Sequence, residues 1–264
     1  MPLALSTLGL PGTPLDRVVG LAADHGWHGL ELRCASDQPV RLQLTPAQRR
    51  ATARLFTRAG VVPLTLASYV GIAGPGPDEP VVADLLAHLR LAADLGCRHL
   101  RVFPHGGPGP AAAADARAVH RLGEVAGHAW SLGVRILVET HDSHRTAAAL
   151  GGVLDRVDHP AVGALWDLLH TWLAGEYPTE THRVLARRLG YVQVKDVASV
   201  EDLTPLALGA GVLPLAACVR LLPRDSWVAW EYEAPWHPAA APLAPRLGAG
   251  ARHLAALPRR QDGP

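Results

Sequence analysis

The sequence predicts a single (β/α)₈ TIM barrel, and three observations favour this fold. Short apolar segments alternate eight times with longer segments of helical periodicity, as parallel strands joined by helices do. The chain has 264 residues, close to the roughly 250 usual for such a barrel. No GxGxxG motif follows the first strand and no Walker-type phosphate loop occurs, which weighs against an open, doubly wound nucleotide-binding sheet.

The expected strands are short apolar runs bounded by glycine, proline or polar residues. The runs Ile136-Leu137-Val138 and Tyr191-Val192 are almost continuously apolar, as in strands that are buried on both faces. The eight expected strands are residues 3–6, 28–33, 61–69, 99–103, 134–140, 162–167, 191–195 and 227–232.

The expected helices show apolar residues at spacings of three and four. Thr13 is a candidate N-cap for the first helix and Gly26 follows its end, while Pro46 lies in the first turn of the second helix and Gly60 ends it. The eight expected helices are residues 14–25, 45–60, 79–95, 113–132, 145–157, 179–189, 214–222 and 242–257. We therefore expect one domain over residues 1–264, with a disordered tail at about 259–264.

Composition narrows the class of partner. The formal net charge is +1, and no stretch carries five or six like charges, so neither a nucleic acid nor a membrane surface is expected to bind. Cys34, Cys97 and Cys218 lie far apart, which predicts free thiols rather than disulfides or a thiolate zinc site. The first residues lack the basic region of a signal peptide. We expect a cytoplasmic protein with a small-molecule substrate.

Polar residues end most of the expected strands, and a TIM barrel builds its active site at these ends. Strands five to eight deliver Glu139, Asp167, Gln193 and Glu231. Carboxylates that meet in a barrel mouth repel one another, and a divalent cation offsets this cost. Oxygen donors suit Mn²⁺, the expected ion, with Mg²⁺ or Co²⁺ as alternatives, whereas the few imidazoles make zinc less natural.

Each of these residues also has a purely structural interpretation. Asp167 could cap a turn, Gln193 could be a buried amide, and Glu231 could form an ion pair with Lys195. Lys195 itself could pair with Asp196 or Glu233 beside the cleft. Their joint placement on four adjacent strands favours a site.

At these residues the chain resembles the xylose isomerase-like barrel superfamily, in particular its sugar phosphate isomerases and epimerases. The resemblance implies that Glu139, Asp167 and Glu231 are metal ligands, and that Gln193 takes the fourth position, where a vHvKD motif commonly places His. The matching segments are GLELR (29–33), LRVFPHGG (100–107), ILVETHDSH (136–144), GALWDLLHTW (163–172), YVQVKDV (191–197), LGAG (208–211) and WVAWEYEAPWHP (227–238).

The resemblance also implies a mechanism. A metal-chelated carbonyl compound forms an enediolate, Glu139 and Glu231 move the proton, and His170 and Lys195 hydrogen-bond the developing oxyanion. Ketose 3-epimerases of the superfamily carry Glu and Arg where this chain has Arg145 and Ser199, which argues against that narrow activity.

Three functions stay open from the sequence. The first is a metal-dependent isomerase or epimerase of a sugar or sugar-like polyhydroxy carbonyl compound. The second is a dehydratase or lyase, of inosose or 3-dehydroshikimate type or acting on an oxidised sugar, and the third is a non-catalytic sugar-binding barrel. A homodimer is also left open. The expected substrate-binding residues are Glu31, Arg33, His105, His141, Arg145 and Trp236, and their positive members suggest an acidic or phosphorylated substrate.

Overall fold

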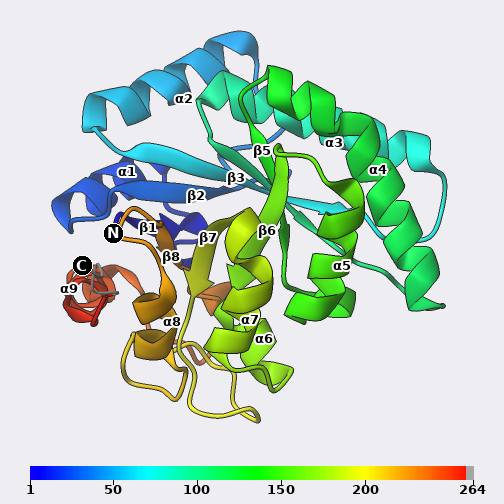
Figure 1. The fold of residues 1–264 in the computed structure, drawn as a ribbon. Helices are drawn as coiled ribbons and strands as arrows, with labels where there is room; N and C mark the ends of the chain where they lie inside the picture. Colours follow the sequence, from blue (N-terminus) through cyan, green and yellow to red (C-terminus); the bar gives the residue numbers. More distant parts are fainter. Residues whose placement is uncertain (260–264) are drawn as a thin grey trace, which may run out of the picture.

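In the computed structural model, which describes residues 1–259, eight parallel strands close into a barrel in chain order (Figure 1). β1 pairs with both β2 and β8, and this second pairing closes the sheet. The predicted (β/α)₈ fold is confirmed. The strands are β1 (Leu3–Ser6), β2 (Gly29–Arg33), β3 (Val62–Gly71), β4 (His99–Phe103), β5 (Arg135–Glu139), β6 (Val162–Asp167), β7 (Leu189–Val194) and β8 (Val228–Trp230).

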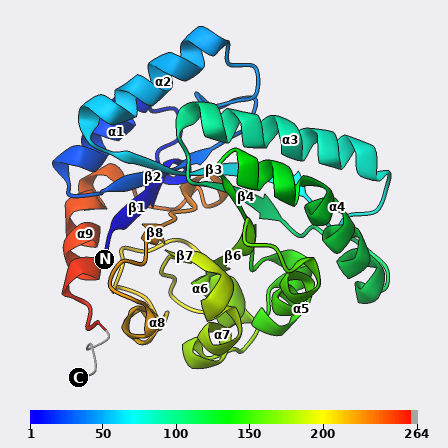
Figure 2. The same cartoon turned by 45° about the horizontal axis from the view of Figure 1, so that its top comes forward.

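Helices surround the barrel, and Figure 2 shows α9 beside β1 and α1, where the chain returns to its beginning. The α-helices are α1 (Leu15–Asp24), α2 (Pro46–Ala59), α3 (Asp78–Leu95), α4 (Ala111–Ser131), α5 (Ala147–Val157), α6 (Leu168–Leu173), α7 (Pro178–Leu185), α8 (Leu215–Leu221) and α9 (Leu247–Ala256). Short 3₁₀ helices are η1 (Thr7–Gly9), η2 (Asp142–His144), η3 (Ala186–Arg188), η4 (Ala234–Trp236) and η5 (Ala244–Arg246).

Helix ends follow local chemistry in α2 but not in α1. Thr45 caps α2 in a capping box with Gln48, and Gly60 ends the helix at φ 65°, a conformation that favours glycine. The predicted cap of α1 is wrong: Pro14 (φ −56°), not Thr13, stands before Leu15 and makes no side-chain cap. α6 was not predicted, because it is a six-residue helix that begins directly at the end of β6.

Two apolar layers build the core. The larger layer packs the helices against the outside of the barrel and includes Trp166 and Trp230. The smaller layer fills the barrel interior and consists of Ala4, Leu64, Leu137, Leu165, Tyr191 and Ala229. Because these side chains fill the lower interior, the strand residues that follow them face the barrel mouth.

No helix within residues 1–259 is both long and apolar enough to span a membrane. Of the tail expected at 259–264, only Arg259 lies within the described part of the chain.

A partly buried histidine at the bottom of the barrel predicts acid sensitivity. The ring of His99 stacks on Tyr191 with centroids 5.7 Å apart, and burial, together with Arg135 and Arg98, lowers its pKa to about 3. Below pH 6.5 His99 is therefore protonated in the unfolded chain, whereas in the folded chain it stays neutral down to about pH 3. Urea unfolding should show a loss of about 2 kcal/mol from this group between pH 7 and pH 5.

The matched variant is His99→Gln, measured at the same two pH values. It should lose less stability than the wild type over this interval, by about the same 2 kcal/mol. Equal pH dependence in both proteins would show that His99 is not the group responsible.

Candidate metal centre

Strand alternation brings the four predicted ligand residues to one rim. Glu139, Asp167, Gln193 and Glu231 each follow, by two positions, a residue of the inner apolar layer, so all four face the barrel interior. All four are buried. Asp167 and Gln193 are also register partners between β6 and β7.

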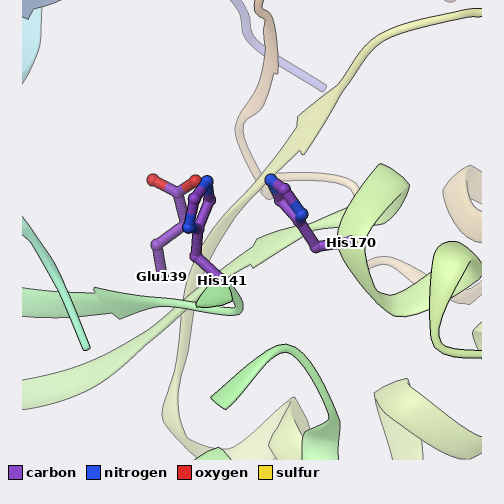
Figure 3. Close-up of side chains that lie close together, drawn as sticks. All are labelled: Glu139, His141 and His170. Atoms are coloured by element: carbon purple, nitrogen blue, oxygen red, sulfur yellow. The ribbon is translucent and has the colours of Figure 1, made fainter. Parts of the chain in front are cut away.

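Glu139 forms a cluster with two histidines at this rim. One ligand atom from each of Glu139, His141 and His170 lies within 4.8 Å of the others. Figure 3 shows Glu139 and His141 side by side at the end of β5, with His170 facing them from α6. The two imidazole rings stand edge to face, with centroids 4.0 Å apart.

Buried atoms without hydrogen-bond partners concentrate at this cluster. Among residues 1–259, no aligned hydrogen bond reaches Glu139 Oε2, His141 Nδ1 or His170 Nε2, nor Asp167 Oδ2 and Gln193 Oε1. Three of these atoms lie near a charged group, with Glu139 Oε2 3.4 Å from Arg101, His141 Nδ1 3.1 Å from Asp142 and Asp167 Oδ2 2.7 Å from Lys195. His170 Nε2 and Gln193 Oε1 have no partner at hydrogen-bond distance within the described part of the chain, although buried polar atoms are normally satisfied.

Burial and Arg101 shift the pKa of the Glu139 carboxyl group in opposite directions. Burial raises its pKa to about 8, although Arg101 opposes this shift, and Glu231 contributes further in the upward direction. Arg101 is itself buried, with Nη1 3.4 Å from Glu139 Oε2 and its guanidinium 4.0 Å from the centre of the Phe103 ring. Without a metal ion, Glu139 therefore holds a proton near neutral pH.

The pKa values of the two histidines are shifted in opposite directions. Burial lowers the pKa of His170 to about 4, so its ring is neutral and has a free lone pair at neutral pH. Burial would also lower the pKa of His141, but Asp142, whose Oδ2 lies 3.1 Å from Nδ1, raises it. A carboxylate beside a histidine ligand is a common way to orient its ring.

Lys195 joins three carboxylates on the other side of the rim. Its Nζ lies 2.7 Å from Asp167 Oδ2, 2.5 Å from Glu231 Oε2 and 2.7 Å from Glu233 Oε1. Burial alone would lower the pKa of Lys195, but Asp167, Glu231 and Glu233 raise it well above its usual value. The ion pairs with Glu231 and Glu233, considered above as structural interpretations, are both present.

Asp167 uses one carboxylate oxygen to cap α6 and the other to pair with Lys195. Its Oδ1 accepts a hydrogen bond of 2.8 Å from the backbone N–H of Leu169 and so caps α6. Burial works against ionisation, but Lys195 and then His170 hold the pKa of Asp167 below its usual value. The carboxylate is therefore charged, and only Oδ2 faces the mouth.

Gln193 is oriented by a buried carboxyl group. Its Nε2 donates to both oxygens of Glu31, at 3.0 and 3.3 Å, and the Tyr191 hydroxyl donates to Glu31 at 2.5 Å. Burial, followed by Glu231, raises the pKa of Glu31 to about 7. Since Glu31 takes the amide N–H groups, the Gln193 carbonyl is the atom left for another partner.

Asp196 binds the backbone of the loop that follows β7 and forms no ion pair with Lys195. Its carboxylate accepts backbone N–H groups of Gly209, Gly211 and Leu213 at 2.8, 3.0 and 3.2 Å. A Cβ at Gly211 would lie 2.3 Å from Asp196 Oδ1, so this loop requires glycine there. Asp196 is therefore not the partner of Lys195.

The remaining predicted residues lie around the mouth at different depths. Arg33 donates to the Tyr69 hydroxyl at 2.7 Å and lies 5.4 Å from the Trp236 ring centre. His105 stacks on Phe103, with centroids 5.0 Å apart. Arg145 is exposed beyond η2, and within residues 1–259 no hydrogen bond or ion pair joins it to Glu139, His141 or His170.

Sequence reasoning missed two features of this site. Arg101 has no role in the sequence prediction above, although it is buried against Glu139. His141 was assigned to substrate binding, and its position beside His170 makes it a candidate metal donor. Arg101 could have been predicted to face inward, because it follows His99 by two positions on an expected strand and His99 stacks on Tyr191 of the inner layer.

A family model described as xylose isomerase-like TIM barrel matches residues 19–257. The chain belongs to this family. The match covers the barrel from α1 to α9, including every residue of the rim. No curated protein matches the chain in sequence.

Solved structures of low sequence identity share this family fold over almost their whole length. A D-psicose 3-epimerase with D-tagatose from Clostridium cellulolyticum is 16% identical, with a TM-score of 0.82 and 97% of this chain and 99% of that one covered. The IolI protein with a bound zinc atom is 17% identical, with a TM-score of 0.81, and the match covers 97% of this chain and 99% of that one. A probable 3-DHS dehydratase, AsbF from Bacillus anthracis, is 17% identical, with a TM-score of 0.79, and the match covers 97% of this chain and 99% of that one.

The rim has the donor chemistry of a divalent metal site. Glu139 and Asp167 offer carboxylate oxygens, and His141 and His170 offer imidazole nitrogens. Two imidazoles at the rim are more than the sequence analysis assumed, so the donors suit Zn²⁺ or Co²⁺ as well as Mn²⁺. The residues present therefore fit a divalent cation.

Proposed function

We propose that this chain is a divalent-metal-dependent isomerase or epimerase of a sugar or sugar-like polyhydroxy carbonyl compound. The observation that carries the proposal is the cluster of Glu139, His141 and His170 at the barrel mouth, whose ligand atoms lie within 4.8 Å of one another. A divalent ion held there would polarise a substrate carbonyl and acidify the neighbouring C–H bond.

The chain's own residues supply the proton transfers. Glu231 lies 2.5 Å from Lys195 Nζ and faces the same rim as Glu139, which puts it in position to accept a proton from carbon. Burial raises the pKa of Glu139 to about 8 in the metal-free protein, and a bound cation would displace that proton. Two carboxyl groups at one rim can serve as the pair that removes a proton from carbon and returns one.

A cavity of about 370 Å³ lies between the loops that follow β1 and β2, with Arg33, Thr13 and Arg41 in its lining, and no residue of the metal cluster lines it. Arg33 and the exposed Trp236 form one edge of the mouth. Aromatic faces and guanidinium groups suit the apolar face and the oxygens of a sugar.

Solvent-exchange experiments test the proposed reaction. Metal-loaded protein is incubated with candidate ketoses and inososes in D₂O, and the products are followed by ¹H NMR. We expect deuterium at the carbon next to the carbonyl, with no loss of water and with strict dependence on added Mn²⁺, Mg²⁺, Co²⁺ or Zn²⁺. Protein that binds no metal and exchanges no substrate would instead support a sugar-binding barrel.

Elimination is the second candidate, because the rim holds more proton-donating groups than an epimerisation needs. Glu31, with a pKa raised to about 7 by burial and then by Glu231, lies below the cluster. Such a group can protonate a departing hydroxyl. An unsaturated product that absorbs in the near ultraviolet, formed with loss of water, would favour the dehydratase over the isomerase.

A further inference from the structure

Lys195 is the only lysine of the chain. Of 25 lysine and arginine residues, the other 24 are arginines. This lysine is almost fully buried, with 2% of its side chain exposed, and its Nζ contacts Asp167, Glu231 and Glu233. An ammonium is a compact charge on a flexible stem, whereas a guanidinium is a rigid planar fork. The one lysine therefore stands where a small, movable cation is of use.

The ammonium occupies oxygens that a divalent ion would need. Asp167 Oδ1 is committed to the Leu169 N–H, so Oδ2 is the oxygen left for a cation, and it lies 2.7 Å from Lys195 Nζ. Glu231 presents Oε2 to the same Nζ at 2.5 Å. A divalent cation and an ammonium on the same oxygens would repel each other strongly in this buried setting.

Glu233 can keep its ion pair with the Lys195 ammonium when the pairs with Asp167 and Glu231 break. It follows β8 by three residues, its Oε1 lies 2.7 Å from Nζ, and 21% of its side chain is exposed. Glu233 thus lies nearer to solvent than Asp167 and Glu231, of which 0% and 9% are exposed. A small rotation of the lysine stem would keep this pair and release the other two.

We propose that Lys195 is a displaceable counter-ion that neutralises Asp167 and Glu231 in the metal-free protein and withdraws to Glu233 when a divalent cation binds. Lys195 and Glu233 are positioning residues in this account, because they set the affinity of the centre through the ligands. The inference rests on the metal centre of the proposed function.

A single lysine makes the displacement directly observable. Protein labelled with ¹³C and ¹⁵N in lysine alone gives one side-chain signal, which belongs to Lys195. Titration with Mg²⁺ or Zn²⁺, both diamagnetic, should shift this signal with the same Kd that calorimetry gives for the metal. Metal binding with an unmoved lysine signal would overturn the inference.

A double-mutant cycle measures the same coupling as metal affinity. Lys195→Met should tighten metal binding by about tenfold or more, since a competing charge is removed, whereas Lys195→Arg should not tighten it. Glu233→Gln should weaken binding by about fivefold or more in the wild type, and by clearly less in the Lys195→Met background. Glu201→Gln, an exposed loop change, should have no effect.

The outcomes separate the two claims. Wild-type protein that binds neither metal contradicts the proposed function. Binding that Lys195→Met leaves unchanged or weakens, or an equal effect of Glu233→Gln in both backgrounds, overturns the counter-ion role alone. If Lys195→Met does not fold, the lysine signal of the wild type still decides.

Discussion

Replacing Glu231 by Gln should lower turnover by about 10²- to 10⁴-fold, since an amide cannot take the proton that the carboxylate accepts from carbon. The shape of the side chain is kept, and its neighbour Lys195 keeps Asp167 and Glu233 as partners. The rate of deuterium incorporation in D₂O, with the ketose or inosose that the wild type exchanges, is the measurement.

Metal content and folding must be checked in the same sample. Metal analysis of the variant separates loss of the base from loss of a ligand, and a thermal melt shows whether it is folded. Glu201→Gln, which changes an exposed loop carboxylate, should keep wild-type turnover. Activity of Glu231→Gln within a few-fold of the wild type would remove Glu231 from the proton transfer.

Replacing Arg101 by Met should destabilise the metal-free protein by about 1.4 kcal/mol more at pH 9 than at pH 6, because only the wild type can ionise Glu139 at the higher pH. Burial raises the pKa of Glu139 to about 8 against the effect of Arg101, so above pH 8 the pair is charged on both sides. Below pH 7 Glu139 is protonated in both proteins, and the loss should shrink. Urea unfolding at pH 6 and pH 9 measures the difference.

Arg188→Met is the matched control for this change. Arg188 pairs with Asp155 and Asp158, whose side chains are 71% and 82% exposed, so its loss should cost about 1 kcal/mol or less. A loss at Arg101 that is no greater than at Arg188, or that does not grow with pH, would contradict the buried ion pair.

The alternation of apolar runs and periodic segments was enough to predict the barrel, because each strand is buried on both faces and each helix on one. Ends were harder to predict. Thr13 has the chemistry of an N-cap, but Pro14 occupies that place. α6 was not predicted because six residues are too few to show helical periodicity, and its cap is Asp167, a residue assigned from the sequence to the candidate site.

The candidate site was predictable where strand geometry decides it. Glu139, Asp167, Gln193 and Glu231 follow inner-layer residues by two positions, and alternation alone brings them to one rim. The positions of His141 and His170 depend on the turn after β5, where Asp142 has φ 45°, and on α6. Such loop conformations are set by tertiary contacts, so the sequence did not place these rings beside Glu139.

Crystals of the protein soaked with Mn²⁺ or Zn²⁺, measured on both sides of the metal absorption edge, test the metal centre most directly. The account predicts one anomalous peak in the barrel mouth, bound by Glu139 together with Asp167 and at least one of His141 and His170. Saturating metal that leaves this mouth without a peak, or a peak bound by other residues alone, would contradict it.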